Sequence, residues 1–577
     1  MIKTLAKSIR EFKLPSVLAA VFVTGEVLME VLVTFLMAKM IDDGFSSNDL
    51  GYVLKIGVIM FVLAVLGLSF GLLSGRYAAV ASSGLARNLR KDIFYNIQEF
   101  SFQNIDKFST PSLVTRMTTD ITNVQTAYMM IVRMLVRAPI MIIFSLIMAV
   151  TLSKSLSLIF IFLIPALLLL LLILIKLAHG FFVRLFKTYD QLNEVTQENL
   201  TGIRTVKAYI RESYEIDKFN ETSERLLKLS KSAEKCLILT QPCMFAMMAV
   251  CIIYFCASGA HLIVAEELTT GALMSLITYA MQILSNLMMV CMVLVTCVMA
   301  RASANRIAEV LNEKSTLKNQ EHPDYDIPDG SIVFDHVTFS YSGGEDKAVL
   351  QDIDLSIASG ETVGIIGGTG SSKTSLVQLI PRLYDVTKGR LLIGGKDVRT
   401  YDLKTLRDAV AVVLQKNVLF SGTISSNLRW GKKDATQEEL EHAAKLAQAD
   451  EFLERFPKKY ETLLDQGGTN VSGGQKQRLC IARALLKKPK ILILDDSTSA
   501  VDTRTDALIR KAFAEEIPDT TKLIIAQRIS SVEHADKILV LQDGQIADMG
   551  THQELLACSD VYREIYESQK KGGLGDE

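Results

Sequence analysis

Two neighbouring carboxylates, Asp495 and Asp496, directly follow four apolar residues in the stretch ILILDDSTSAVD, residues 491–502. A short apolar run of this kind predicts a buried strand. Carboxylate oxygens at the end of such a strand are suitable ligands for a hard divalent cation such as Mg²⁺. Hydrolytic chemistry at position 496 would be better served by the longer side chain of glutamate. The sequence therefore raises the question of why the shorter acid stands there.

A second candidate site lies in the stretch GIIGGTGSSKTSLVQLI, residues 364–380, which predicts a strand, a glycine-rich turn and a helix. Phosphates bind at helix N-termini because partial positive charge and free N–H groups meet there. The P-loop spacing G-x-x-x-x-G-K-[ST] maps onto Gly367 to Thr374. We expect Lys373 to reach the β- and γ-phosphates of ATP and the Thr374 hydroxyl to ligate Mg²⁺. The residues predicted to bind ATP here are Gly367, Gly368, Thr369, Gly370, Ser371, Ser372, Lys373, Thr374 and Ser375.

Ser372 is the one departure from the P-loop spacing, since it stands where the last glycine belongs. If that position needs a left-handed backbone, a residue other than glycine costs roughly 1–2 kcal/mol.

The elements that position these residues fall into two halves. The chain has 577 residues, too many for one ordinary core, and 49% of them are hydrophobic. Apolar runs in the front half exceed about 18 residues, which is enough for a helix to span a bilayer. We expect six spans, at about 15–40, 53–78, 133–152, 155–179, 236–263 and 271–300.

The links between the spans predict the orientation of the chain. The second and fourth links are long and basic, whereas the other three are short and poor in basic residues. Because positive charge stays on the cytoplasmic side, both termini and the two long links are expected in the cytoplasm, with the spans in the cytoplasmic membrane. The long links are rich in helix formers, so we expect them to continue the helices below the membrane.

Charged residues also occur within the spans. Glu26 and Glu30 are four residues apart in the first span and so share one helical face. Each acid at the bilayer centre costs roughly 2.5–3.5 kcal/mol, so the pair is expected to face protein or water. Arg133 and Arg137, four apart near the start of the third span, are candidate partners. Either a polar spot in a transport cavity or an internal ion pair would explain the arrangement.

The remaining pattern divides the chain into domains. Residues 1–14 predict a basic helix in the membrane interface or, alternatively, a frayed terminus. Residues 15–305 form the predicted six-helix membrane domain, 306–330 a linker, 331–570 an α/β nucleotide-binding domain, and 571–577 a flexible tail. The predicted fold class is therefore an α-helical membrane domain fused to an α/β P-loop domain. The formal net charge of −1 does not show the excess of positive charge that indicates nucleic-acid binding.

The stretch NVSGGQKQR, residues 470–478, precedes the acidic strand. With this combination the chain resembles a half-transporter of the ATP-binding cassette (ABC) family, of the exporter type, over nearly its whole length. ENLTGIRTVKAYIRES, residues 198–213, resembles the family's second intracellular loop with its coupling helix. Importers of the family generally keep membrane and nucleotide domains on separate chains, which disfavours an importer.

The resemblance implies roles for individual residues around the chain's own nucleotide. Tyr341 resembles the aromatic residue that stacks on adenine. Gln415 resembles the Q-loop glutamine that touches Mg²⁺ and senses the membrane domain. Asp495 resembles the Walker B aspartate, which holds Mg²⁺ through water.

Other residues resemble the parts that act on the nucleotide of the opposite subunit. Asp502 resembles the D-loop aspartate that joins the two sites. The signature that caps the γ-phosphate is matched by Ser472, Gly473, Gly474 and Gln475.

Besides Ser372, three positions depart from the family pattern. Asp496 stands where a glutamate normally polarises the attacking water, and Gln527 stands where the switch histidine is expected. Gln466 occupies a further position that usually carries glutamate. Asp is about 1 Å shorter than Glu, and a misplacement of that size can cost about 10²-fold in rate. Gln can hydrogen-bond a phosphate but cannot carry the charge of a protonated imidazole.

These departures predict an asymmetric transporter. Nucleotide domains of the family pack head to tail, so each ATP lies between one chain's P-loop and the other chain's signature. Asp496, Gln527 and Ser372 all concern the nucleotide on this chain's P-loop, whereas the signature is intact. We hypothesise a heterodimer with a second half-transporter that carries the glutamate and the histidine. This chain would hold ATP as a clamp and hydrolyse it weakly.

Two alternatives are a slow homodimeric exporter and an ATP-gated regulator or channel. The transported substrate is predicted only as a class, because Met-rich spans suit varied apolar ligands but also ordinary helix packing. Drugs, lipids and hydrophobic peptides all fit, as in multidrug or lipid exporters.

Overall fold

The computed structural model describes residues 1–45, 47–341, 347–496 and 501–573, apart from some side chains in 171–186 and 236–240 and those of 571–573. The chain divides into two compact units. The first, here called the membrane unit, comprises residues 1–98 and 110–313. The second, here called the nucleotide unit, comprises residues 99–109 and 314–577.

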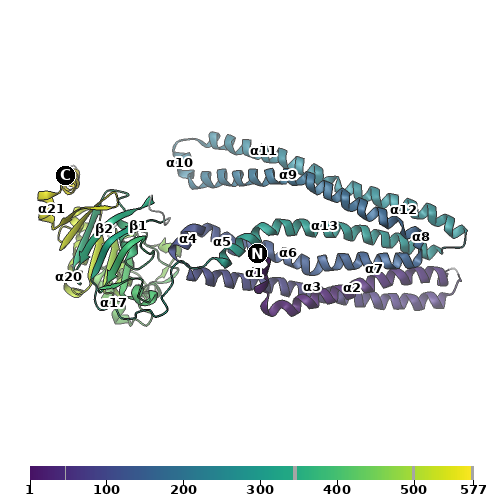
Figure 1. Cartoon of the computed structure of the whole chain (residues 1–577), viewed down its shortest axis with the longest axis horizontal. Helices are drawn as coiled ribbons and strands as arrows, with labels where there is room; N and C mark the ends of the chain where they lie inside the picture. Colours follow the sequence, from purple (N-terminus) through teal and green to yellow (C-terminus); the bar gives the residue numbers. More distant parts are fainter. Residues whose placement is uncertain (46, 342–346, 497–500, 574–577) are drawn as a thin grey trace. The chain divides into compact units, whose positions relative to one another are not determined.

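The membrane unit is built from long helices (Figure 1). Among the described residues, five helical stretches are long and apolar enough to cross a membrane: Arg10–Phe45, Leu50–Glu99, Thr110–Leu152, Gln241–Val264 and Thr270–Asn312. The predicted fourth span falls in α9 (Ile159–Thr201), where several side chains lie outside the described residues. The helices of this unit are α1 (Ile2–Lys7), α2 (Lys13–Lys39), α3 (Leu50–Glu99), α5 (Thr110–Thr115), α6 (Ile121–Met130), α7 (Val136–Leu152), α8 (Lys154–Ser157), α9, α10 (Ile203–Ala208), α11 (Glu212–Ile238), α12 (Thr240–Val264) and α13 (Thr270–Asn312).

The two long links continue as helices beyond the apolar stretches. α3 is a single helix that carries the chain from the second predicted span through the following basic residues to Glu99. α9 and α11 run side by side and are closed by the short helix α10 (Figure 1). The segment that resembles a coupling helix is therefore the tip of a long helical hairpin.

The ends of three predicted segments differ from the structure. The N-terminal helix α1 stops at Lys7, and a 3₁₀ turn at Arg10–Phe12 leads into α2, because Arg10 has a positive φ of 41°, which is not helical. Phe12 packs on Gly84 of α3. α13 continues past residue 305 to Asn312, since Ile307, Ala308 and Val310 extend its buried face. α22 (Asp560–Gly573) continues past residue 570 through part of the predicted tail, and residues 574–577 lie outside the described residues.

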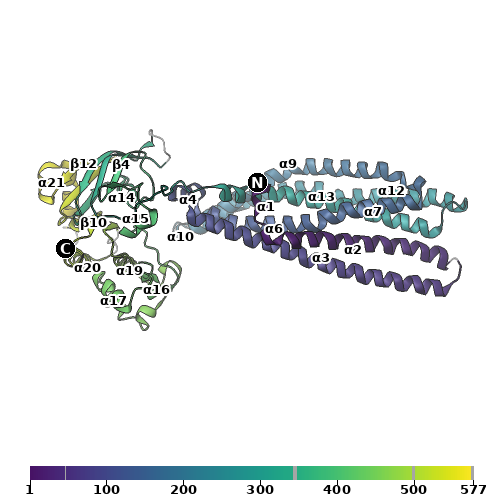
Figure 2. The same cartoon turned by 60° about the horizontal axis from the view of Figure 1, so that its bottom comes forward.

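The nucleotide unit contains a six-stranded sheet in the order β12-β11-β3-β10-β9-β6 and a four-stranded antiparallel sheet in the order β2-β1-β4-β5. β7 and β8 form a separate pair. The strands are β1 (Ile332–Phe339), β2 (Leu350–Ile357), β3 (Thr362–Gly367), β4 (Lys388–Ile393), β5 (Lys396–Asp397), β6 (Val410–Val413), β7 (Gly422–Thr423), β8 (Leu463–Leu464), β9 (Ile491–Asp495), β10 (Thr521–Ile525), β11 (Lys537–Gln542) and β12 (Gln545–Gly550). Figure 2 shows helices around these sheets.

The central strands are rich in apolar residues because they are buried. Every residue of β9 and of β10 is buried, as expected for parallel strands covered on both faces. The helices of this unit are α4 (Phe102–Phe108), α14 (Lys373–Leu379), α15 (Leu403–Ala409), α16 (Ile424–Leu428), α17 (Gln437–Leu446), α18 (Asp450–Leu453), α19 (Gly473–Leu485), α20 (Thr503–Glu516), α21 (His552–Cys558) and α22. Two apolar clusters share β9, one containing Leu492 and Leu494 and the other Ile491 and Ile493, so the strand that ends at Asp495 is packed on both faces.

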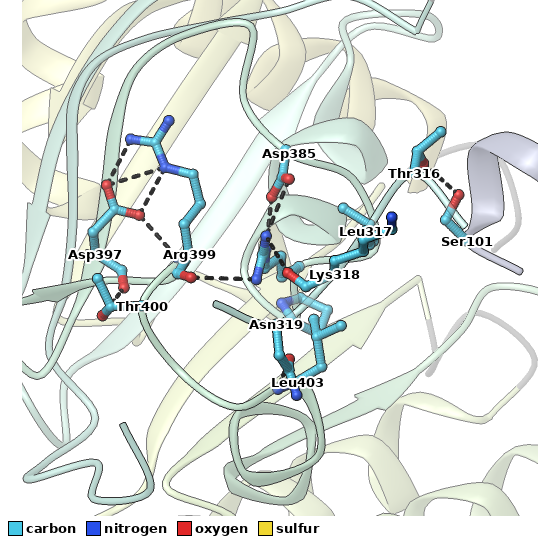
Figure 3. Close-up of polar contacts among 12 residues, drawn as sticks. Ser101, Thr316, Leu317, Lys318, Asn319, Asp385, Asp397, Arg399, Thr400 and Leu403 are labelled. Carbon is cyan, nitrogen blue, oxygen red and sulfur yellow. Dashed lines mark hydrogen bonds and ion pairs between the residues drawn. The ribbon is translucent and has the colours of Figure 1, made fainter. Parts of the chain in front are cut away.

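Residues 314–319 hold α4 to the nucleotide unit. The hydroxyls of Ser101 and Thr316 lie 2.7 Å apart (Figure 3). The Thr316 amide also donates to Oδ1 of Asn104. Further along, the side-chain oxygen of Asn319 accepts from the Leu403 amide at 3.0 Å. The chain that enters the nucleotide unit is therefore fastened to α4 and to the first turn of α15.

The buried Arg382 forms hydrogen bonds with the same segment. The Arg382 guanidinium donates to both carboxylate oxygens of Asp385, at 2.7 and 3.2 Å. It also donates to the carbonyl of Lys318 at 3.4 Å. Arg382 has a positive φ of 50°, and its charge is satisfied by Asp385, so it fixes the backbone of residues 314–319 without leaving an unpaired ion.

Candidate nucleotide-binding site

Four adjacent strands bring the predicted residues together. β3, β10, β9 and β6 are parallel neighbours in the six-stranded sheet, so their carboxyl ends meet at one edge. The P-loop follows β3, Gln527 follows β10, Asp495 ends β9, and Gln415 follows β6. Ligands of open α/β sheets bind at this edge, beyond the carboxyl ends of the strands.

Lys373 is folded over the P-loop. Its ammonium donates to the carbonyls of Gly367 and Gly368, each at 2.8 Å, and to the Ser371 hydroxyl at 3.2 Å. Burial lowers the pKa of Lys373, with the Asp495 and Asp496 carboxylates acting in the opposite direction. Phosphate oxygens would replace these neutral acceptors by charged ones, which makes stronger hydrogen bonds.

The glycines of this loop leave room for a phosphate chain. A side chain on Gly368 or Gly370 would meet no atom within 4 Å, so the loop is an open cradle there. Gly367 is needed for a different reason, because a Cβ would lie 2.2 Å from the carbonyl oxygen of Leu541. The loop is thus packed against β11 at its base and open above.

Ser372 adopts the left-handed conformation, with φ 70° and ψ 21°. The backbone that a glycine normally provides is therefore kept by a serine, at a local cost of roughly 1–2 kcal/mol.

Thr374 and Asp495 form a set of hard oxygen donors. The Thr374 hydroxyl lies 3.0 and 3.2 Å from the two carboxylate oxygens of Asp495. Burial raises the pKa of the Asp495 carboxyl, and the hydrogen bond from Thr374 opposes that rise. A hydroxyl beside a carboxylate suits Mg²⁺, which prefers oxygen ligands and is usually shared with nucleotide phosphates.

Asp496 is held by two amides. Its Oδ2 accepts from Nε2 of Gln527 at 2.7 Å and from Nε2 of Gln415 at 3.4 Å. Its backbone has a positive φ of 47°, and its amide donates to the carbonyl of Ile525 at 3.1 Å. The side chain is buried, with 9% of the residue's surface exposed. Gln415, Asp496 and Gln527 therefore form one hydrogen-bonded group at the strand ends.

Tyr341 presents an aromatic ring beside the P-loop helix. Its hydroxyl lies 2.9 Å from the Ser375 hydroxyl. Edge-to-face contacts with Phe339 and Tyr384, with ring centroids 4.8 and 5.1 Å apart, hold the ring in place. The ring itself is exposed and free to stack on a flat base.

The signature residues lie apart from this group, at the start of α19. Ser472 is the N-cap, and it and Gln475 form a reciprocal capping box with hydrogen bonds of 3.3 and 2.9 Å. Asp502 is the N-cap of α20 and accepts from the Thr505 amide at 2.9 Å. Ser472 and Gly473 are exposed, as is Gln466 upstream of them, so this end of α19 faces outward.

Glu26 and Glu30 lie in the membrane unit, where both pair with Arg137 of α7. Arg137 donates to Glu26 through Nη1 and to Oε2 of Glu30 through Nη2 at 2.7 Å. Arg133 is placed differently: it lies opposite Gly75 of α3 and lines a groove of ≈730 Å³ together with Glu26 and Glu30. Arg76 of α3 also lines the groove, and apolar side chains of α2 and α3, including Met29, Val33, Leu63 and Leu68, make up much of the remaining lining.

Two contacts were not predicted from the sequence. Nε2 of the buried Gln477 donates to the backbone carbonyl of Asp496 at 3.5 Å, which connects α19 to the end of β9. The Tyr384 hydroxyl donates to Asp106 of α4 at 2.7 Å while its ring contacts Tyr341. Burial, followed by the Asp106 carboxylate, raises the pKa of Tyr384. Gln477, the second glutamine of SGGQKQR, is a polar residue whose position in the sequence could have indicated the first contact. No local pattern indicates the contact between Tyr384 and Asp106.

Comparison with known proteins agrees with this architecture. A model described as the ABC transporter transmembrane region matches residues 16–288, and one described as ABC transporter matches residues 350–499. The chain is 38% identical over 561 residues to the uncharacterized ABC transporter ATP-binding protein YfiB of Bacillus subtilis, covering 97% of each. It is 30% identical over 573 residues to the ATP-dependent lipid A-core flippase of Desulfotalea psychrophila, covering 99% of each.

A solved structure shares the fold. A bacterial Atm1-family ABC exporter with ATP bound matches with a TM-score of 0.81, covering 97% of this chain and 98% of that chain, at 24% sequence identity.

Proposed function

Because the chain belongs to the ABC transporters and has the fold of an exporter of that family, we propose that it uses ATP to export an amphipathic substrate. Its place would be the cytoplasmic membrane, with both termini in the cytoplasm. It would work as one half of a heterodimer, in which its own P-loop holds ATP and its signature completes the hydrolytic site on the second half-transporter.

The observation that supports this most is the hydrogen bonding of Asp496. A general base must be free to accept a proton from the attacking water. Here Oδ2 of the short Asp496 side chain accepts from the amides of Gln527 and Gln415, so the carboxylate is engaged by neutral groups where the family has a glutamate beside a histidine. Neither amide can accept and release a proton at neutral pH. The three side chains therefore form a polar cap over the end of β9 that is better suited to retaining ATP than to hydrolysing it.

The proposal also assigns roles to the P-loop residues, the Mg²⁺ ligands and the signature. Lys373 and the open P-loop cradle would hold the phosphates, and Tyr341 would stack on the adenine. Thr374 and Asp495 would hold Mg²⁺, which neutralises phosphate charge when bound. Ser472, Gly473, Gly474 and Gln475 would cap the γ-phosphate on the partner, with Asp502 connecting the two sites.

The groove of the membrane unit supports an amphipathic substrate class. It combines apolar side chains with four charged residues, Glu26, Glu30, Arg76 and Arg133. The two acids and the two arginines give the groove both signs of charge beside its apolar side chains, and Arg137 pairs with both acids. A molecule with a polar head and an apolar body fits this chemistry. One relative is a lipid A-core flippase, which is consistent with a lipid-like substrate.

The heterodimer is tested by isolating the chain from its native membranes in mild detergent and identifying what accompanies it. We expect a second half-transporter in equal amount, carrying glutamate and histidine at the positions equivalent to 496 and 527. Recovery of this chain alone as a dimer would contradict the proposal and favour the slow homodimeric exporter.

Asp496→Glu is expected to raise hydrolysis at this chain's site only severalfold, because Gln527 still lacks the charge of an imidazole. Adding Gln527→His should give the larger gain, approaching the roughly 10²-fold that a displaced catalytic group can cost. Turnover is measured with the partner's catalytic glutamate replaced by glutamine, so that only this site contributes. A full gain from Asp496→Glu by itself would show that Gln527 is not limiting.

A further inference from the structure

The C-terminal helix α22 reaches the loop that carries Gln527. The side-chain amide of Gln569 makes two hydrogen bonds to the backbone of this loop. Nε2 donates to the carbonyl of Gln527 at 2.8 Å, and Oε1 accepts from the amide of Ile529 at 2.9 Å. One side chain therefore fixes the backbone on both sides of Arg528.

α22 is firmly attached to the nucleotide unit. Tyr562 is fully buried, and its hydroxyl lies 2.7 Å from Nδ1 of His552 in α21. Val561, Ile565 and Tyr566 pack against the apolar core. Arg563 donates to the carbonyls of Leu556 and Ala557 at the end of α21. Gln569 thus projects from an anchored helix.

The other end of the loop is held separately by α20. Arg510 donates to the carbonyl of Ser530 at 2.8 Å, and the Ser531 hydroxyl donates to Asp506 at 3.3 Å. These contacts lie beyond Ile529, which is itself buried. Gln569 therefore acts on the part of the loop that aims Gln527 at Asp496.

We propose that Gln569 is a positioning residue for the nucleotide site, which holds Gln527 against Asp496 and makes retention of ATP depend on the docking of α22. This rests on the proposed function, in which this chain's site retains ATP. Movement of α22 would release the backbone of Gln527, and the hydrogen bond from Gln527 to Asp496 would weaken with it. The docked C-terminal helix thereby contributes to retention of ATP.

The test uses the complete transporter purified with its partner and loaded with labelled Mg-ATP. The rate at which label leaves is followed after a chase with unlabelled ATP. In the wild type we expect a slowly released fraction. Gln569→Ala should release that fraction about five- to tenfold faster, as expected for loss of two hydrogen bonds. Ser568→Ala, the exposed neighbour on the same helix, is the matched control and should leave the rate unchanged.

A second variant separates positioning from a general loss of structure. In the Gln527→Ala background, Gln569→Ala should change release by less than about twofold, because coupled residues are not additive. Gln569→Glu keeps the acceptor for Ile529 but loses the donor to Gln527, and should resemble Gln569→Ala. Thermal denaturation of each variant verifies folding.

The outcomes distinguish the two proposals. If the wild type shows no slowly released ATP, the proposed function fails and the inference fails with it. If the wild type retains ATP but Gln569→Ala releases it at the same rate, only the positioning role is overturned. Equal effects of Gln569→Ala with and without Gln527 would also overturn it.

Discussion

Gly474→Asp in this chain is expected to lower ATP turnover by the complete transporter by more than about 100-fold, the scale seen when a group that stabilises charge in the transition state is lost. Gly474 lies in the first turn of α19, behind the Ser472 cap. An aspartate there would place negative charge against the γ-phosphate held by the partner. The same charge favours a helix N-terminus, so α19 should remain folded.

The matched control for Gly474→Asp is Lys373→Ala in the same chain. In the proposed function Lys373 would hold the nucleotide on this chain's own P-loop, where turnover is expected to be small already. Steady-state hydrolysis should therefore fall only a few-fold, while ATP binding to this chain is lost. Both variants are assayed with an unmodified partner. If Lys373→Ala stopped turnover as completely as Gly474→Asp, the two sites would be equivalent and the asymmetric proposal would be wrong.

Arg137→Ala should strongly destabilise the membrane unit. Arg137 donates to both Glu26 and Glu30, so its removal leaves two carboxylates without their cation. A charged acid costs about 2.5–3.5 kcal/mol at the bilayer centre. Oε2 of Glu26 is already buried and, among the described residues, has no hydrogen-bond partner. We expect a marked fall in thermal unfolding temperature and in the yield of membrane-inserted protein.

Two variants separate the charge effect in Arg137→Ala from a loss of packing. Replacing Glu26, Glu30 and Arg137 together by glutamine removes all three charges and should restore most of the stability, because isolated charges cost more than absent pairs. Arg137→Lys keeps the positive charge but loses the two-pronged geometry, and should be intermediate. Instability of the triple variant equal to that of Arg137→Ala would show that packing, not charge, is responsible.

Much of the nucleotide unit could be predicted because its signals are local. Four apolar residues before Asp495 indicate a buried strand, and the spacing from Gly367 to Thr374 indicates a phosphate loop. Parallel strands place their carboxyl ends at one edge, so the meeting of Gln415, Asp495 and Gln527 follows once the strands are identified. The left-handed conformation of Ser372 follows from the same spacing, since a glycine normally stands there.

The contacts that could not be predicted join distant parts of the chain. Gln569 and Gln527 belong to different elements, and only the packing of α22 brings them together. Arg133 and Arg137 were equally good partners for the two acids by spacing, and the choice of Arg137 depends on how α7 is turned against α2. Tyr384 and Asp106 are likewise joined only because α4 lies on the nucleotide unit.

The attachment of α4 has a practical consequence for anyone who wishes to express the nucleotide-binding half by itself. Cutting the chain near residue 331 would remove α4 and residues 314–319 together, although both belong to this unit. The ring of Tyr384 would lose its contact with Phe102, and the Arg382 guanidinium would lose the carbonyl of Lys318. A fragment that keeps the surroundings of Tyr341 and Tyr384 should therefore begin before Lys314 and carry residues 99–109 as a tethered peptide.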